Sequence, residues 1–291
     1  MKRVVIWKVI KNLFFMEVMI LSLKSFLESR DVRNKFKQEF NKPKLRMRGE
    51  LLAPPLTKRY GLVGTAFDYL LRFYIKRLNP NAIETVWISE RSVRILSISM
   101  EFQKMIIKCA KKIHSEFIKS GEMSDDLFEI VILLAQLDVI YRVGIMDENF
   151  GVVDKRDVKD LKNLVSLVKP EYFTASKVCI LNPTFGIASK LVGGADCDLV
   201  IDDAIIEIKT VKDLEFSRDY FNQLMGYYTL YKIGGIDGMK KRAKINRLGI
   251  YYSRYAKLYY INLYDIINPR TFPGFIKWFR DKATERHKLH L

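Results

Sequence analysis

Three side chains of this sequence are spaced to do chemistry together: Asp198, Glu207 and Lys209. Two carboxylates held close to each other repel, and a divalent cation between them removes that repulsion. Hard oxygen ligands with open water positions suit magnesium or manganese. An ammonium group beside them can hold a water molecule or stabilise charge that grows on a phosphate. The residue types therefore predict a Mg²⁺ or Mn²⁺ site that acts on a phosphate group.

A β-hairpin is expected to bring these residues together. Asp202 and Asp203 lie between two apolar runs and suit a tight turn, because Asp tolerates unusual backbone angles. If they form the turn, Ile201 pairs with Ala204, and alternation puts every second side chain on one face. Charge on an exposed hairpin face is often only solvated, so a purely structural role stays open. Counting back from the turn gives two pairs on the charged face: Asp198 with Glu207, and Asp196 with Lys209.

A helix follows the hairpin, from about 217 to 233. Gln223 and Tyr227 are four residues apart, so they share one face of this helix. We expect Gln223 to orient a base or a phosphate, and Tyr227 to contact a nucleic-acid backbone or to pack near the metal. The alternative is an ordinary amphipathic helix with tyrosines at its rim.

These motifs together resemble the RecB-like branch of the PD-(D/E)XK nuclease superfamily, over roughly 178–252. The resemblance implies a restriction-endonuclease-like central mixed sheet flanked by helices. It implies that Asp198 and Glu207 bind the metal, that Ile208 offers its backbone carbonyl, and that Lys209 assists the attacking water. Gln223 and Tyr227 match the extra motif of this branch and complete the expected catalytic set.

An upstream helix is expected to add one more ligand. Gly64-Thr-Ala-Phe-Asp68 is similar to the Gly-Thr helix start of RecB-like nucleases, with Asp68 where a metal-binding histidine would stand. Asp68 is therefore expected to complete the metal shell, although an Asp near a helix start is also favoured by the helix dipole alone. The cysteines that hold an iron–sulfur cluster in some members of the branch are missing.

The net charge of +17 over 291 residues indicates a polyanionic partner, although a lysine-rich surface kept for solubility is the alternative. The densest basic run, with the cations and tyrosines that follow it, is expected to bind nucleic acid. A weaker candidate is the basic stretch 42–48, and a purely solvated loop remains the other reading. The expected contacts are Lys240, Lys241, Arg242, Lys244, Arg247, Arg254 and Lys257.

Three cysteines without a C-x-x-C pair exclude a disulfide framework and a four-cysteine metal site within this chain. The composition argues against a membrane protein, and we expect a cytoplasmic, intracellular location. The first residues are basic and then apolar, faintly like a signal peptide, but Lys8, Lys11 and Glu17 interrupt the run. This segment is interpreted as an extra amphipathic helix, or as residues before the true start at Met16 or Met19.

The apolar pattern predicts a mainly helical N-terminal region before an α/β part. We expect an extension with a linker over 1–60, a helical region packing on the core over 61–170, and the nuclease core over 171–291. The expected helices are 22–40, about 62–79, 91–120, 126–143, 155–168, 217–233 and 273–286. The expected strands are 178–181, 197–201, 204–210, 248–252 and 258–263.

The sequence as a whole predicts a metal-dependent deoxyribonuclease that hydrolyses phosphodiester bonds in single- or double-stranded DNA. A catalytically inactive nucleic-acid-binding module of the same fold and an RNA-directed nuclease are the alternatives. A homodimer would suit paired cuts in a duplex, by analogy alone.

Overall fold

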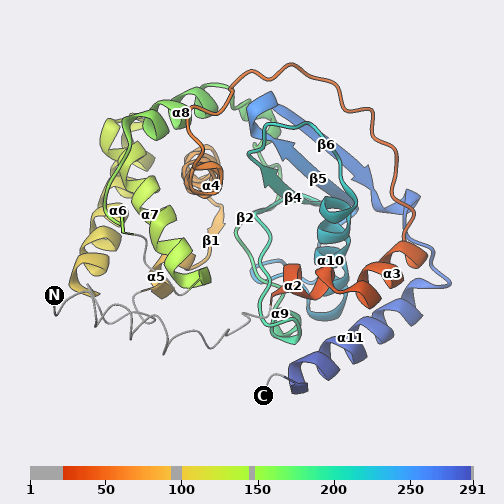
Figure 1. The fold of residues 1–291 in the computed structure, drawn as a ribbon. Coiled ribbons are helices and arrows are strands. Elements are labelled where there is room, and N and C mark those ends of the chain that lie inside the picture. Colours follow the sequence, from red (N-terminus) through yellow and green to blue (C-terminus); the bar gives the residue numbers. More distant parts are fainter. Residues whose placement is uncertain (1–21, 93–99, 144–147, 290–291) are drawn as a thin grey trace.

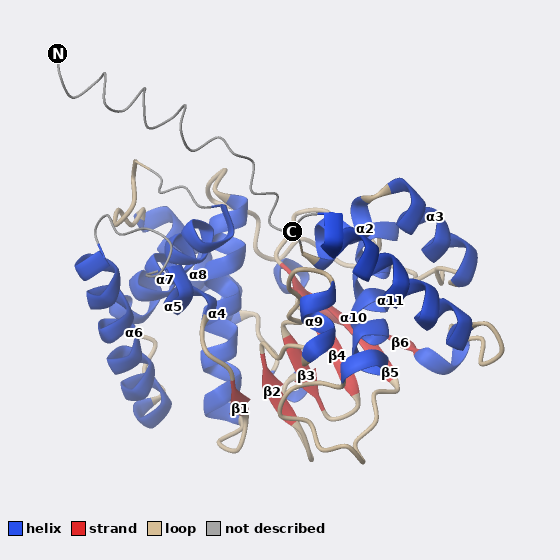
Figure 2. Cartoon of the chain, turned by 90° about the horizontal axis from the view of Figure 1, so that it is seen from below, coloured by secondary structure: helices blue, strands red, loops and turns tan. Residues whose placement is uncertain are grey.

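A computed structural model describes residues 22–92, 100–143 and 148–289 of the chain. It shows three layers, with one sheet between two groups of helices (Figures 1 and 2). The N-terminal segment before residue 22, and with it the question of its role, lies outside the described residues. Within the described part, no helix has the length and apolar composition needed to cross a membrane.

The sheet is open and mixed, with its strands in chain order across it. The first two strands run parallel, as do the fourth and fifth, and the other neighbours are antiparallel. Five strands match the predicted runs to within two residues, and the α/β class with a mixed sheet is confirmed. The strands are β1 (Ile83–Glu84), β2 (Cys179–Leu181), β3 (Leu199–Ile201), β4 (Ala204–Lys209), β5 (Arg247–Tyr252) and β6 (Lys257–Asn262).

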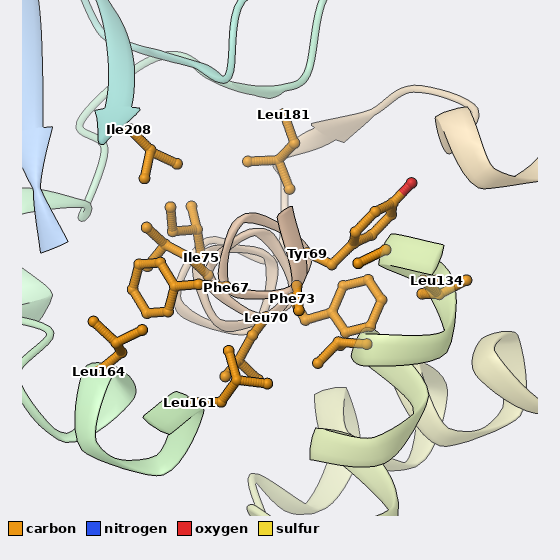
Figure 3. Close-up of a cluster of buried hydrophobic side chains, with 14 of the residues drawn as sticks. Phe67, Tyr69, Leu70, Phe73, Ile75, Leu134, Leu161, Leu164, Leu181 and Ile208 are labelled. Atoms are coloured by element: carbon orange, nitrogen blue, oxygen red, sulfur yellow. The ribbon is translucent and has the colours of Figure 1, made fainter. Parts of the chain in front are cut away.

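One face of the sheet is covered by α4, which is itself surrounded by other helices (Figure 3). Ile208 and Leu181 reach α4 from the sheet, while Leu161 and Leu164 reach it from the opposite side. A helix that is apolar on nearly every side must be buried on every side, and α4 accordingly lies at the centre of this layer. The helices here are α4 (Tyr60–Leu78), α5 (Ile88–Ser92), α6 (Met100–Ser120), α7 (Asp125–Val143) and α8 (Lys155–Ser166).

The other face is covered by α10 and by a group of helices from both ends of the chain (Figure 2). Phe36 packs edge to face on Phe40 and Phe275, so the N-terminal and C-terminal helices share one aromatic cluster. The helices are α2 (Leu23–Glu28), α3 (Arg30–Glu39), α9 (Ile187–Leu191), α10 (Arg218–Gly234) and α11 (Phe272–Leu289).

Three features of the helices and strands differ from the prediction. The single helix expected over 22–40 is divided at Ser29, whose extended backbone (ψ 142°) ends α2 before α3 begins. Both α9 and β1 were not predicted, because segments of five and two residues carry too little periodicity to detect. The helix expected over 91–120 corresponds to the end of α5 and to α6, and residues 93–99 between them are outside the described part.

Candidate active site

The β3–β4 hairpin has the predicted turn and register. Ile201 pairs with Ala204, and Asp202 adopts a left-handed backbone conformation with φ 52°. The Asp202 carboxylate also accepts hydrogen bonds from the backbone N–H groups of Ser176, Lys177 and Val178, at 2.6 to 3.1 Å. The turn is therefore held from two sides, which fixes the register of the three residue pairs next to it.

The predicted pairing does not continue to the acids themselves. The backbone pairing between β3 and β4 ends at Leu199 and Ile206. Beyond this point, the side chain of Asp198 makes the next contact with β4. Its Oδ2 accepts a hydrogen bond of 2.6 Å from the backbone N–H of Ile208. The expected pair of Asp196 with Lys209 is wrong, because Asp196 instead forms an isolated antiparallel bridge with Thr184.

Lys209 is held by two oxygens at the end of β4. Its Nζ lies 2.7 Å from Glu207 Oε1 and 3.0 Å from Gln223 Oε1, and Gln223 Nε2 donates to the Tyr227 hydroxyl at 2.8 Å. Burial alone would lower the pKa of Lys209, but the Glu207 carboxylate outweighs it and raises that pKa. The prediction that Gln223 and Tyr227 share one face is confirmed. Gln223 of this face accepts a hydrogen bond from Lys209.

Tyr227 is not placed to touch a nucleic-acid backbone. Its ring stacks on Phe185 with centroids 5.5 Å apart, and only 5% of the residue is exposed. Burial, followed by the negative charges of Glu207 and Asp198, raises the pKa of its hydroxyl well above the usual range. The predicted contact of Tyr227 with a nucleic-acid backbone therefore does not agree with the structure. Its packing near a metal stays a prediction, and the charges of Glu207 and Asp198 act on its hydroxyl.

Asp68 approaches the hairpin from α4. Gly64, one turn earlier, lies against Thr210, so the start of α4 meets the end of β4. Asp68 Oδ2 accepts a hydrogen bond of 2.7 Å from Arg72, whereas its Oδ1 is buried without a partner. Burial raises the pKa of Asp68, and the Arg72 cation counteracts that rise. Asp68 is therefore part of a buried charged cluster and not a simple surface residue at a helix start.

Five carboxylates and three cations interact in this cluster. Burial is the main cause that raises the pKa of Asp196 and Asp198, and neighbouring carboxylates add to it. With every group ionised, these eight side chains carry a net charge of −2, which a single divalent cation would balance. The members are Asp68, Asp138, Asp196, Asp198 and Glu207, with Arg72, Arg142 and Lys209.

Asp138 and Arg142, four residues apart on α7, also belong to this cluster. They form an ion pair, and Asp138 also accepts a hydrogen bond of 3.2 Å from Tyr69 of α4. Arg142 also lowers the pKa of Asp196 and Asp138 raises it, so this ion pair lies close to the candidate site. Arg72 was not predicted; its spacing of four residues from Asp68 was the available signal.

The donor set suits a hard divalent cation. Glu207 Oε2 and Asp68 Oδ1 are both buried without a hydrogen-bond partner, an arrangement that costs about 1 to 3 kcal/mol for each such atom. No three His, Cys, Asp or Glu side chains among residues 22–92, 100–143 and 148–289 are already grouped as ligands. Coordination would therefore require these carboxylates to turn toward a common point. Asp198 and the Ile208 carbonyl are the other predicted donors.

The predicted basic surface is divided by the fold. Ala204 pairs with Arg247 at one end of β4, and Lys209 pairs with Tyr252 at the other. The basic loop 240–244 leads into Arg247, so it lies at the far end of the strand from Lys209. At about 3.3 Å per residue, the two ends are ~16 Å apart. The loop therefore does not flank the site, and its binding to nucleic acid stays a prediction.

Three other predicted cations differ in their surroundings. Arg247 pairs with Asp203 at 2.5 Å and lies over the Tyr260 ring. Arg254 is 1% exposed and forms two hydrogen bonds with Asp160, at 2.8 and 3.0 Å, so it is not available to a phosphate. Its predicted contact with nucleic acid is therefore wrong, because its charge is used inside the protein. Lys257 is exposed and lies at the same end of the sheet as Lys209.

Comparison of the chain with protein-family models, with curated proteins and with solved structures gives no match. The chemistry of the site is consequently argued from its own residues.

Proposed function

We propose that this chain is a metal-dependent nuclease whose site is built from Asp68, Asp198, Glu207 and Lys209. The observation that carries the proposal is the presence of two unsatisfied, buried carboxylate oxygens around Asp198. Glu207 Oε2 belongs to the carboxylate that binds Lys209, and Asp68 Oδ1 belongs to a carboxylate whose charge acts on Asp198. A bound cation would account for two such carboxylate oxygens, because it would supply the partner that each of them lacks. The open mixed sheet is compatible with the restriction-endonuclease-like fold that the sequence motifs imply.

The lysine has the donor geometry that the reaction needs. An ammonium group has three N–H donors, and Glu207 and Gln223 accept two of them. The remaining donor can orient the attacking water or stabilise charge on a phosphate oxygen. Gln223 and Tyr227 are positioning residues, because they fix Lys209 and lie behind it. A divalent cation held by Asp68, Asp198, Glu207 and the Ile208 carbonyl would polarise the scissile phosphate.

A cleavage assay tests the proposal. Purified protein is incubated with single-stranded DNA, double-stranded DNA and RNA, in EDTA, Mg²⁺ and Mn²⁺. We expect cleavage only with a metal, and a loss of about a hundredfold or more in rate for Glu207→Gln and for Lys209→Met. Lys190→Met, which removes an exposed lysine from α9, is the matched control and should cleave like the wild type.

The assay also separates the alternatives. Faster cleavage of RNA than of DNA would replace the proposed substrate while keeping the mechanism. Cleavage that is equal in wild type, Glu207→Gln and Lys209→Met would show a contaminating nuclease and would refute the proposal.

A further inference from the structure

A second basic surface, unlike the predicted loop, lies next to the candidate site. Arg30, Arg33, Asn34 and Lys37 recur at the spacing of one helical face, and all four are exposed on α3. Together with Arg218 of α10 and Glu28, they line an open hollow. We call this hollow the α3–α10 surface. Its lining has four cations and one carboxylate, and a second carboxylate, Asp219, pairs with one of these cations.

The first turn of α10 connects this surface to the site. Arg218, Asp219 and Tyr220 are consecutive in that turn. Asp219 forms an ion pair with Arg33 of α3, while the Tyr220 ring lies 4.7 Å from the Nζ of Lys209. The two contacts leave from neighbouring positions of one helical turn, so the first turn of α10 lies between the α3–α10 surface and the candidate catalytic lysine.

The turn is itself fixed in place. Arg218 Nη1 donates to the carbonyl of Phe40 at 3.0 Å, and Lys42 Nζ donates to the carbonyl of Phe216 at 2.8 Å. Ser217 caps α10 by accepting from the backbone N–H of Tyr220. The segment that follows α3 is therefore bound to the start of α10. These contacts fix the position of both helices relative to each other.

We infer that the α3–α10 surface binds the phosphate backbone of the nucleic acid on one side of the reacting phosphate. The inference rests on the proposed function, in that nucleic acid is the ligand. Arginine and lysine bind phosphates with little regard to sequence, and such contacts set the register of the strand. The apolar face of α3, with Val32 and Phe36, is buried in the core, so this helix has no apolar face to insert into a membrane.

Arg30 and Lys37 are the residues to test. Among the residues that the structure describes, neither has an ion-pair partner, so changing them breaks no contact that holds the fold. The double variant Arg30→Glu/Lys37→Glu reverses two charges on the α3–α10 surface. The matched control is Lys155→Glu/Lys159→Glu, which reverses two exposed charges one turn apart on α8, in the other helical layer.

Binding is measured by fluorescence anisotropy of a labelled DNA oligonucleotide in EDTA, over a range of salt concentrations. We expect Arg30→Glu/Lys37→Glu to weaken binding about tenfold or more and to reduce the slope of log K against log salt by about 2. The α8 control variant should bind within about twofold of the wild type. Arg30→Gln/Lys37→Gln should give an intermediate loss, and melting temperatures check that all variants fold.

The inference falls if Arg30→Glu/Lys37→Glu binds DNA like the wild type, if it and the α8 control lose affinity equally, or if the wild type does not bind DNA. It also falls if, in a parallel assay with phosphatidylserine vesicles, the α3 variant changes only the binding of vesicles. Binding that depends on α3 without any cleavage in Mg²⁺ or Mn²⁺ would refute the proposed nuclease activity and leave this surface standing.

Discussion

Lys209 is the residue whose surroundings differ most from those of an ordinary surface lysine. Only 16% of its side chain is exposed, and its Nζ forms an ion pair with Glu207 Oε1 at 2.7 Å. A buried ion pair is a weak source of stability, because desolvation offsets much of the attraction. A contribution to stability therefore does not explain why this lysine is buried, whereas the proposed catalytic role does. Gln223, at 3.0 Å, restricts the ammonium to one orientation.

A metal ion should stabilise the protein independently of any cleavage. At a concentration a hundredfold above its Kd, a ligand that binds only the folded state contributes about 2.7 kcal/mol. For a chain of this size that corresponds to a rise in Tm of about 5 °C or more. We expect Mn²⁺ to raise the Tm of the wild type and EDTA to reverse the rise, as followed by differential scanning fluorimetry.

Glu207→Gln provides the control for that measurement. The substitution keeps the size of the side chain and removes its charge, so the shift with Mn²⁺ should shrink markedly. An equal shift in both proteins would mean that the cation binds elsewhere, and the proposed ligand set would be wrong.

Between elements, α4 and α6 meet through a histidine that is kept neutral. The ring of His114 packs on Phe73 at 4.2 Å and on Trp87 at 5.5 Å, and its Nε2 is buried without a hydrogen-bond partner. Glu84 Oε1 is 3.6 Å away, close enough to pair only if the ring is protonated. Burial, with the nearby charge of Lys76, lowers the pKa of His114 to about 4.

This contact predicts how stability depends on pH. In the unfolded chain His114 takes up a proton near pH 6.5, its ordinary pKa, whereas in the folded protein it does so only near about 4. The folded state is therefore fully favoured above about pH 6.5 and loses stability as the pH falls toward about 4. Between about pH 7.5 and pH 5, the loss due to this one residue is about 2 kcal/mol.

Urea unfolding at several pH values measures this loss, with His114→Phe as the comparison. The variant cannot take up a proton at this position, so its free energy of unfolding should fall about 2 kcal/mol less over the same interval. The difference in slope is the quantity of interest, since the substitution also changes packing. Parallel pH curves for the two proteins would contradict the assigned role of His114.

At the scale of the whole molecule, one buried arginine joins distant parts of the chain. Arg254, after β5, binds both Asp160 of α8 and the carbonyl of Ala53, the latter at 2.8 Å. The loop from 41 to 59 also donates two backbone hydrogen bonds to the Arg254 carbonyl. This loop crosses from α3 to α4 over the edge of the sheet near β6 (Figure 1), so Arg254 fastens the connection between the two helical layers.

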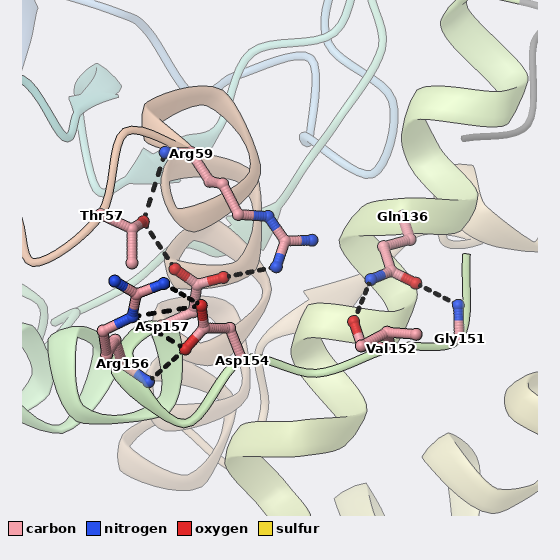
Figure 4. A network of polar contacts seen from close by, with 8 residues as sticks. All are labelled: Thr57, Arg59, Gln136, Gly151, Val152, Asp154, Arg156 and Asp157. Carbon is pink, nitrogen blue, oxygen red and sulfur yellow. Dashed lines mark hydrogen bonds and ion pairs between the residues drawn. The ribbon is translucent and has the colours of Figure 1, made fainter. Parts of the chain in front are cut away.

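A polar network fixes the place where that loop enters α4 (Figure 4). Asp157 accepts hydrogen bonds from Thr57 at 2.7 Å and from Arg59 at 2.9 Å. Because α4 carries Asp68 two turns further on, the network and the Arg254 pair together determine how far that carboxylate stands from β4. The loop therefore helps to position α4, and with it Asp68, against β4.

Removing one partner of the Arg254–Asp160 pair should be strongly destabilising. Arg254→Met leaves the fully buried Asp160 carboxylate without its cation, and we expect a loss of about 3 to 5 kcal/mol. The double variant Arg254→Met/Asp160→Leu removes both charges and should be more stable than the single variant. Guanidinium unfolding of Arg254→Met, Asp160→Leu and the double variant measures the coupling energy between the two residues. A loss of stability in the double variant equal to the sum of the two single losses would contradict this coupling.

The local structure around the site was determined by the sequence itself. Alternation of apolar residues and the Asp202–Asp203 turn were sufficient to predict the β3–β4 register, and helical spacing predicted that Gln223 and Tyr227 share a face. These relations hold within a few residues of the chain, where backbone geometry leaves few alternatives. For the same reason Glu207 and Lys209 were correctly placed on one face of β4.

Other features were decided only by tertiary packing. The end of the ladder at Leu199, the burial of Arg254 and the position of the basic loop all depend on which strands and helices become neighbours. Asp68 reaches the acids because α4 is buried against the sheet, although 130 residues of chain separate it from Asp198. Such contacts follow from how apolar faces fill a common core. The sequence indicated Asp68 only through the resemblance of its Gly-Thr motif to a known family, and no local pattern indicated the other three features.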